Sequence, residues 1–290
     1  MFVSSNSGFS VKKYFQERLF DLYSEREIRF FFQAIVEHRL DLNSSELLLS
    51  DKLLFSESDL LYFRSVLKRL QSHEPFQYIL GETFFYNIKI LCDSRALIPR
   101  PETEELVDWV LDSLEVKRAY NILDICTGTG CIALALKSKL LASKIYATDL
   151  SQDALALAKK NAISLNLSVD FSIENALLGD PGNFLSDSLD VIISNPPYIP
   201  VKDKQYMEKN VLDFEPNLAL FVSDDNPLIF YKAITEKANT CLKKEGLLFF
   251  ELHEQYALET KELVQRFGFN SVEIKQDLQG KNRMLRAKKK

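Results

Sequence analysis

The sequence has 290 residues, too many for one ordinary small domain and too few for three. Its hydrophobic fraction of 46% allows a sizeable core, and 27% charged residues give an ordinary soluble surface. The net charge of −5 argues mildly against a protein whose main role is to bind a nucleic-acid backbone. No run of about 18 apolar residues predicts a membrane-spanning helix, and the amino terminus lacks the basic-then-apolar order of a signal peptide. We therefore expect a cytoplasmic protein without a membrane partner.

The potential metal ligands are scattered along the chain. No Cys-x-x-Cys pair occurs among the four cysteines, and the three histidines lie far apart. Neither a metal site nor a disulfide framework is expected, so the thiols should be reduced. The residues concerned are Cys92, Cys126, Cys131, Cys241, His38, His73 and His253.

Helical periodicity dominates the first quarter of the chain. Apolar residues recur at spacings of three and four in VKKYFQERLFDLY, REIRFFFQAIVEHRL and SDLLYFRSVLKRL. Ser56 or Ser58 can cap the third of these helices. Residues 1–74 are therefore predicted to form a small helical domain, with the Phe30–Phe32 stripe in its core.

The segment 75–100 has a different character. Pro75 interrupts the helical pattern, and FFYNIKI places aromatic and β-branched residues around Asn87. Such a run is typical of a short strand pair. We interpret residues 75–100 as a connector that contains a β-hairpin.

From residue 101 to residue 290, strand-like and helix-like segments alternate. Pro101 suits the first turn of a helix, and Ser151 suits a cap. This order predicts an α/β domain with a mostly parallel sheet and helices on both faces, with an irregular stretch after residue 198. The expected strands are NILDIC, SKIYATD, LSVDFSIE, LDVIIS, GLLFFEL, NSVEIKQ and RMLRAK, and the expected helices are ETEELVDWVLDSL, GTGCIALALKSKL, SQDALALAKKNAISL, PLIFYKAITEKANTCL and QYALETKELVQRF.

The stretch DICTGTG leaves a buried strand and enters a helix through a glycine turn. Gly128 and Gly130 allow a tight turn and a close approach of the backbone to a ligand. Asp149 ends the next strand, where an acid can accept both hydroxyls of a ribose. The turn fits a dinucleotide or S-adenosylmethionine, and the glycine spacing favours the latter. Asp124 is then placed to hold the amino group of the methionine moiety.

A second polar cluster, NPPY, follows the strand LDVIIS. Two prolines end the strand, because neither can donate to a sheet ladder. The side-chain oxygen of Asn195 and the main-chain carbonyl of Pro196 offer two adjacent acceptors for a planar NH₂ group. Pro197 stiffens the backbone, and Tyr198 offers a flat face for a planar amide.

DxxTGTG, Asp149 and NPPY together form the motif set of class I S-adenosylmethionine-dependent methyltransferases that act on a planar nitrogen. The segment EPFQYILGETFFYNIKILCDSRALIPRPETEELV resembles the connector of the peptide chain release factor glutamine methyltransferases, the PrmC/HemK family, in which IPRPETE recurs. DFEPNLAL and KNRMLRAK resemble the loop after NPPY and the closing strand of that family. The resemblance covers about residue 74 to the end.

The resemblance implies a Rossmann-like methyltransferase fold and an enzyme that methylates the glutamine of the GGQ motif in release factors. S-adenosylmethionine would be the methyl donor and S-adenosylhomocysteine the product. A release factor would be the partner of a monomeric enzyme that holds no nucleic acid stably, and the helical domain would dock it. By position, the catalytic residues are Asn195, Pro196, Pro197 and Tyr198. The cofactor-binding residues are Asp124, Cys126, Thr127, Gly128, Thr129, Gly130, Asp149, Asn175 and Asn195.

The chain departs from the family pattern at two cofactor positions. Cys126 stands where the family usually has glycine, and a cysteine fits there if its φ angle is negative. Asn175-Ala176 replaces the usual Asp followed by an aromatic residue or Leu. Ala176 cannot stack on an adenine, which predicts a lower affinity for the cofactor.

Other functions remain as alternatives. A glutamine methyltransferase acting on a ribosomal protein shares the fold, and IPRPETE favours release factors over it. An adenine-N6 DNA methyltransferase shares NPPY but would need a basic DNA-binding face. A non-catalytic adaptor would not need Asp149 and NPPY, and an NAD-dependent oxidoreductase would need the full G-x-G-x-x-G. Two further sets of residues each have two open interpretations. One set, Arg100, Glu102 and Thr103, either closes over the cofactor or forms a capping and salt-bridge cluster at a domain junction. The other set, Glu215 and Pro216, either lines the substrate channel or shapes a loop.

Overall fold

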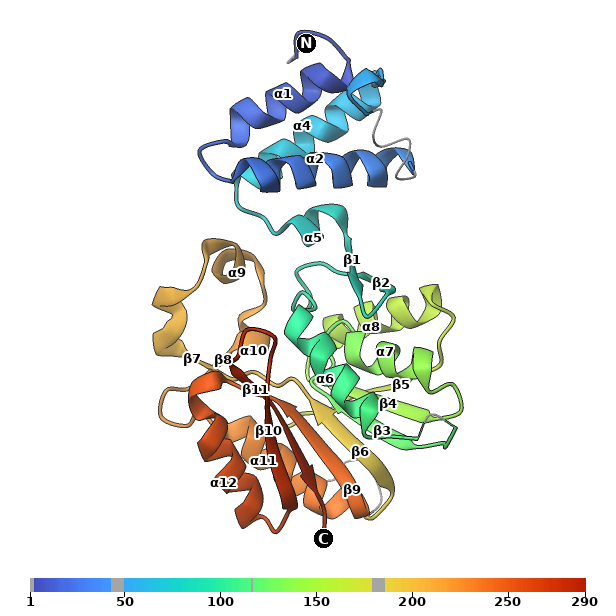
Figure 1. The fold of residues 1–290 in the computed structure, drawn as a ribbon, viewed down its shortest axis with the longest axis vertical. Coiled ribbons are helices and arrows are strands. Elements are labelled where there is room, and N and C mark those ends of the chain that lie inside the picture. The colour runs from blue at the N-terminus through green and yellow to red at the C-terminus, as the bar shows by residue number, and fades with distance from the viewer. Residues whose placement is uncertain (1–2, 43–49, 116, 179–185) are drawn as a thin grey trace. The chain divides into compact units, whose positions relative to one another are not determined.

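The computed structural model describes residues 3–42, 50–115, 117–178 and 186–290 (Figure 1). The chain folds into two compact units. The first unit comprises Met1–Gly81 with Lys209–Phe214, and the second comprises Glu82–Glu208 with Glu215–Lys290. Among the described helices, none is both long enough and apolar enough to cross a membrane.

The first unit is helical, as the sequence predicts. Serines cap the three long helices, and Ser56 rather than Ser58 caps α4 by accepting the N–H of Asp59. Phe15, Phe32 and Phe63 pack together in the core of this unit. The elements are α1 (Gly8–Leu19), α2 (Glu25–Leu40), a 3₁₀ turn (Ser50–Lys52), α4 (Glu57–Gln71), α5 (Phe76–Leu80) and α9 (Lys209–Phe214).

The Phe30–Phe32 stripe is only partly buried, so the expectation that all three rings belong to the core is wrong. Phe32 is 1% exposed, whereas Phe30 is 58% exposed. Successive residues of a helix point about 100° apart, so three neighbours span too wide an arc to face one core.

The hairpin predicted around Asn87 is confirmed. Strands β1 (Glu82–Phe85) and β2 (Ile88–Leu91) pair antiparallel, with Phe85 opposite Ile88. Tyr86 and Asn87 have φ angles of 49° and 62°, so both turn residues are left-handed. This is the backbone of a two-residue type I′ turn, whose twist matches that of paired strands.

A seven-stranded sheet forms the second unit, in the order β10-β11-β9-β6-β3-β4-β5. The five strands from β9 to β5 are parallel, and β11 and β10 add antiparallel at one edge. The predicted mostly parallel sheet is therefore confirmed. The strands are β3 (Asn121–Ile125), β4 (Lys144–Asp149), β5 (Asp170–Ile173), β6 (Leu189–Ser194), β9 (Leu242–Glu251), β10 (Asn270–Gln276) and β11 (Asn282–Lys288).

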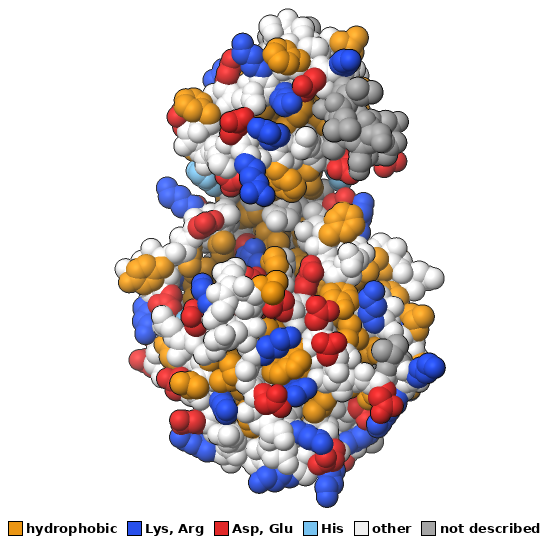
Figure 2. All heavy atoms as spheres, viewed as in Figure 1, with side chains coloured by type: hydrophobic (Ala, Val, Ile, Leu, Met, Phe, Trp, Pro, Cys, Tyr) orange, Lys and Arg blue, Asp and Glu red, His pale blue; other side chains and the backbone are white. Residues whose placement is uncertain are grey.

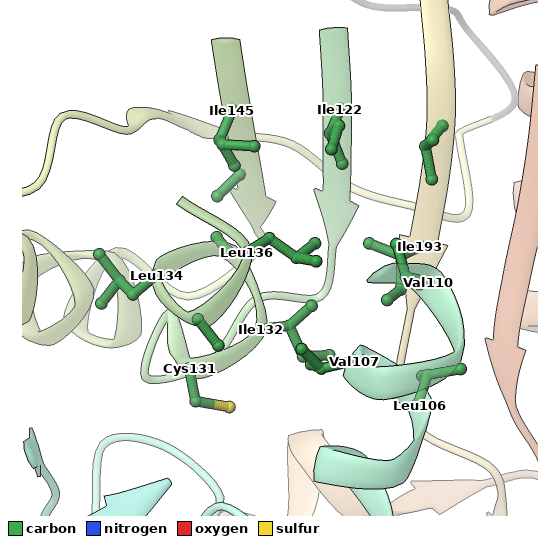
Figure 3. Packing of buried hydrophobic residues seen from close by; sticks show 14 of the residues in the cluster. Leu106, Val107, Val110, Ile122, Cys131, Ile132, Leu134, Leu136, Ile145 and Ile193 are labelled. Carbon is green, nitrogen blue, oxygen red and sulfur yellow. The ribbon is translucent and has the colours of Figure 1, made fainter. Parts of the chain in front are cut away.

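Helices cover both faces of this sheet because the central strands are apolar on both sides. Ile122 packs in the core beneath α6 and α7, and its neighbour Leu123 packs in the core beneath α11 and α12. In Figure 3, Ile122, Ile145 and Ile193 of three neighbouring strands lie against helices α6 and α7. The helices are α6 (Pro101–Asp112), α7 (Cys131–Lys139), α8 (Gln152–Ser164), α11 (Ile229–Cys241) and α12 (Ala257–Arg266).

The stretch after NPPY, expected to be irregular, contains several short elements. Strands β7 (Ile199–Pro200) and β8 (Phe221–Val222) pair in parallel, and a 3₁₀ turn (Val201–Tyr206) and α10 (Asn217–Leu220) lie between them in the chain. Elements this short leave no periodic pattern in the sequence, so periodicity alone does not reveal them.

The sheet order reverses at β3, which has β4 on one side and β6 on the other. In an open parallel sheet, ligands bind outside the carboxyl ends of the strands at such a point. The motifs DICTGTG and NPPY follow β3 and β6, so this position in the fold brings them to one end of the sheet.

Candidate functional site

A cavity of about 200 Å³ opens at the carboxyl ends of these strands. Its walls come from the turn after β3, the ends of β4 and β5, the residue after β6, and the connector before α6. It contains Cys126–Thr129, Asp149, Asn175, Asn195 and Pro197 of the predicted site residues. Asp124, Gly130, Pro196 and Tyr198 are not among its lining residues.

Gly130 instead shapes the turn from which α7 starts. Its φ angle is +81°, and a Cβ atom there would lie 3.1 Å from the Cβ atom of Ala158 on α8. Only glycine meets both requirements without strain. Gly130 therefore allows α7 and α8 to pack closely beside the cavity.

Asp124 lies at the end of β3 and is fully buried. Its Oδ2 atom accepts the hydroxyl hydrogen of Thr127 at 2.6 Å, while Oδ1 has no partner among the described residues. Burial raises the pKa of this carboxyl to about 7. The Oγ1 atom of Thr129 is likewise buried without a described partner. Of these two residues, only Thr129 lines the cavity.

Cys126 adopts the left-handed conformation, with a φ angle of +63°. The expectation that a cysteine is accommodated here by a negative φ angle is wrong. A residue with a Cβ atom costs roughly 1–2 kcal/mol in this conformation, which explains the glycine usual in the resembling family. Burial raises the pKa of the Cys126 thiol, so it stays protonated and is a poor nucleophile.

Asp149 joins the glycine turn to the start of α8. Its Oδ2 atom accepts the main-chain N–H of Gly128 and its Oδ1 atom accepts that of Ser151, both at 2.9 Å. Each carboxylate oxygen can accept a second hydrogen bond. Burial raises the pKa of Asp149, and the main-chain donors counteract this rise. Asp149 lines the cavity, and the remaining acceptor capacity of its two oxygens suits a pair of neighbouring hydroxyls.

Glu174, just after the end of β5, was not singled out from the sequence. Glu174 also lines the cavity and pairs with Lys237 of α11, whose side chain is only 1% exposed. The Oε2 atom of Glu174 is buried without a described partner. Asn175 lines the cavity too, but its Oδ1 atom accepts the N–H of Leu177. A lysine within an otherwise apolar helix face was the only sequence signal for this pair.

The side chain of Asn195 belongs to a hydrogen-bonded chain of buried groups. Its Nδ2 atom donates to Oγ1 of Thr103 at 3.2 Å, and Thr103 donates to Oε2 of Glu251 at 2.6 Å. The Tyr198 hydroxyl donates to the other oxygen, Oε1, at 3.0 Å. Glu251 is 2% exposed, and sequence analysis missed it. An acid at the end of the apolar strand GLLFFEL was the available signal.

A second ion pair joins the connector to the loop after NPPY. The carboxylate of Glu215 accepts from the Arg100 guanidinium at 2.5 Å and from the main-chain N–H of Ile98 at 3.1 Å. The side chain of Glu215 is 1% exposed, and Arg100 and Pro216 line the cavity. Both open questions are thus answered in part: Thr103 supports Asn195, and Arg100 fixes a cavity wall.

No group of three or more histidine, cysteine or acidic side chains suited to a metal ion occurs among the described residues.

Two family models match the chain. Residues 13–81 match the PrmC N-terminal domain, and residues 106–213 match the methyltransferase small domain. The release factor glutamine methyltransferase of Flavobacterium psychrophilum is 40% identical over 95% of this chain and 98% of its own length. The chain belongs to the release factor glutamine methyltransferase family. The resemblance read from IPRPETE and NPPY is confirmed.

Other relatives agree with this assignment. The release factor glutamine methyltransferase of Bacteroides thetaiotaomicron is 35% identical over 96% of this chain and 98% of its own length. Among solved structures, a methyltransferase from Pyrococcus furiosus superposes with a TM-score of 0.53 at 19% identity, covering 77% of this chain and 98% of the other. That structural likeness supports the fold alone.

The conformation of Cys126 generates a prediction about stability in this family member. At an ordinary position, glycine is less stable than alanine by roughly 0.5–1 kcal/mol. At a left-handed position the order reverses, so Cys126→Gly should be more stable than Cys126→Ala by about 1 kcal/mol. Urea unfolding followed by the fluorescence of Trp109, the single tryptophan, measures this in the second unit. Equal midpoints, or a more stable Cys126→Ala variant, would contradict the strain.

Proposed function

We propose that this chain transfers a methyl group from S-adenosylmethionine to the side-chain amide nitrogen of the glutamine in the GGQ motif of a release factor. Family membership supports the reaction class. One observation carries the proposal: Asn195 donates its NH₂ group to Thr103, within the same cavity wall that holds Asp149. The Oδ1 atom of Asn195 is thereby left as an acceptor for the NH₂ group of a substrate amide.

The residues around the cavity fit S-adenosylmethionine. Asp149 offers two carboxylate oxygens to the ribose hydroxyls, and Thr129 offers a polar side chain near the turn. Gly128 faces the cavity without a side chain, since its nearest neighbour in the Cβ direction is Ala96 at 3.9 Å. Glu174 and Asn175 are proposed to face the adenine. When bound, S-adenosylmethionine supplies a methyl group on a positively charged sulfur.

The contribution of the chain to the reaction is mainly positioning. An amide nitrogen is a poor nucleophile, so its alignment with the methyl group matters more than a strong base. The Asn195 Oδ1 atom and the Pro196 carbonyl are proposed to accept the two N–H groups of the substrate. Pro197 holds this segment rigid, and Tyr198 is fixed by its bond to Glu251. Alignment of reacting groups can supply several kcal/mol, on the order of 7–11 in the best cases.

We propose that three segments of the chain have different tasks. Residues 1–74 would dock the release factor, residues 75–100 would connect, and residues 101–290 would bind the cofactor and carry out the transfer, with the enzyme acting as a cytoplasmic monomer. On the face shown in Figure 2, basic and acidic side chains are interspersed over the larger unit and do not form a basic field. The net charge of −5 also favours a protein substrate over duplex DNA.

Methyl transfer from labelled S-adenosylmethionine tests the proposed function. Three substrates are compared: a release factor with GGQ, the same factor with the glutamine replaced by alanine, and adenine-containing duplex DNA. Label should appear on the first substrate alone. Label on DNA would favour the adenine-N6 alternative, and no label on the release factor would favour another protein substrate.

The role of Asp149 is tested by cofactor binding. In Asp149→Asn, the amide NH₂ group must face the N–H of Gly128 or that of Ser151, so one main-chain donor loses its acceptor and one ribose contact is lost. The affinity for S-adenosylhomocysteine should fall roughly tenfold to a hundredfold, measured by titration calorimetry. Asp153→Asn, in the first turn of α8, is the matched control and should bind as the unmodified chain does. An unchanged affinity in Asp149→Asn would exclude the assigned role.

The docking role of the helical domain is tested by hydrogen exchange on the intact chain. A release factor with GGA in place of GGQ is added, so that no turnover occurs. Amides of α1, α2 and α4 should become protected, because a docked partner excludes water from them. Protection confined to the second unit would contradict docking through residues 1–74.

A further inference from the structure

The hydrogen bonds that link Asn195, Thr103 and Glu251 share one direction: Asn195 donates to Thr103, and Thr103 donates to Glu251. Glu251 lies at the carboxyl end of β9, Thr103 lies in the first turn of α6, and Asn195 follows β6. All three side chains are wholly or partly buried, so water does not readily replace the bonds between them.

The direction follows from the number of hydrogens available. Both oxygens of Glu251 accept hydroxyl hydrogens, Oε2 from Thr103 and Oε1 from Tyr198, so the single hydroxyl hydrogen of Thr103 goes to Glu251. The Thr103 oxygen can then only accept from Asn195. The amide of Asn195 must therefore place its NH₂ group toward Thr103 and its Oδ1 atom away from it.

Burial outweighs the groups that stabilise the charge of Glu251, so its pKa lies above the ordinary value. Burial raises the pKa of Glu251, while the hydroxyls of Thr103 and Tyr198 and the charge of Arg283 on β11 lower it. Glu102 on α6 acts in the opposite direction. From α11, the Tyr231 hydroxyl donates to the main-chain carbonyl of Glu251, so it leaves the carboxylate itself to Thr103 and Tyr198.

We propose that Glu251 is a positioning residue that sets which end of the Asn195 amide faces the substrate, and so makes the site select an amide NH₂ over a carboxylate. The inference rests on the proposed function for the identity of the substrate. It does not need Glu251 to touch the substrate or the cofactor. Tyr198, held by the other oxygen of Glu251, is fixed by the same group.

Replacement of Glu251 by glutamine allows the donors and acceptors of these hydrogen bonds to be reversed. In Glu251→Gln the new side-chain amide can donate to Thr103, and Thr103 can then donate to Oδ1 of Asn195. In that arrangement the Asn195 amide is reversed, and its NH₂ group faces the substrate. An NH₂ group there repels a substrate NH₂ and attracts a carboxylate.

The test compares the binding of two release factors to the chain saturated with S-adenosylhomocysteine. One factor carries GGQ, and the other carries glutamate in place of that glutamine. The unmodified chain should prefer GGQ. In Glu251→Gln the ratio of the two affinities should fall roughly tenfold to a hundredfold, with cofactor affinity unchanged. An unchanged ratio would overturn the proposal.

Three further variants separate orientation from simple loss of structure. Thr103→Val removes the hydroxyl that links Glu251 to Asn195 and should also lower the ratio of the two affinities. Thr103→Ser keeps a hydroxyl at this position and should have the ratio of the unmodified chain. Asp190→Asn is the matched control, because Asp190 is a largely buried carboxylate near the opposite end of β6, where it accepts the main-chain N–H of Asn121. A ratio that falls equally in Asp190→Asn, or that also falls in Thr103→Ser, would contradict this role of the hydroxyl.

Nuclear magnetic resonance of the Asn195 side-chain amide provides a readout that needs no substrate. The signal is assigned by its loss in Asn195→Ala. It should shift in Glu251→Gln and Thr103→Val but not in Asp190→Asn. If the unmodified chain fails to methylate GGQ while this pattern holds, the proposed substrate is wrong and the positioning role stands. A signal that Glu251→Gln leaves in place would overturn the positioning role itself.

Discussion

The site depends on one constraint: parallel strands that share a sheet end at the same edge. β3, β4 and β6 are neighbours around the point where the strand order reverses, and each is followed by, or ends on, a polar side chain. Asp124, Asp149 and Asn195 are therefore brought together although they are far apart in the chain. Burial at this edge makes hydrogen bonds a requirement for most polar groups, although Oδ1 of Asp124, Oγ1 of Thr129 and Oε2 of Glu174 have none among the described residues.

That requirement explains why each buried carboxylate has its own set of donors. An isolated buried charge costs several kcal/mol, so it persists only where hydrogen bonds or an opposite charge offset the loss of water. Asp149 accepts two main-chain N–H groups, Glu215 accepts Arg100 and Ile98, and Glu251 accepts two hydroxyls. These partners also fix the cavity walls, because they tie turns and loops at this edge of the sheet to one another.

Sequence patterns predicted the elements whose side chains alternate with a regular period. Period-two and period-3.6 patterns revealed the sheet and its helices, and the turn around Asn87 revealed the hairpin. Motifs placed Asp149 and Asn195 because both follow recognisable strands. Phe30 was misplaced because a run of three aromatic residues does not state which of them faces the core.

The remaining parts of the site depend on contacts between distant segments, which no local pattern records. Thr103 and Glu251 lie 148 positions apart and meet only in the folded chain. The conformation of Cys126 was misjudged because a residue type does not fix its backbone angle when the surrounding turn does. Glu174 was passed over because its partner Lys237 lies 63 positions away in the chain and meets it only in the folded protein.

The two cysteines beside the glycine turn have a consequence for the chemistry of the intact protein. Burial raises the pKa of Cys131 to about 12 and that of Cys126 in the same direction. Peroxides and alkylating reagents attack the thiolate, which is scarce at neutral pH under these conditions. The sulfur atoms in the wall of this methyl-transfer site therefore react slowly with such reagents, because burial and the neighbouring carboxylate of Asp124 keep both thiols protonated.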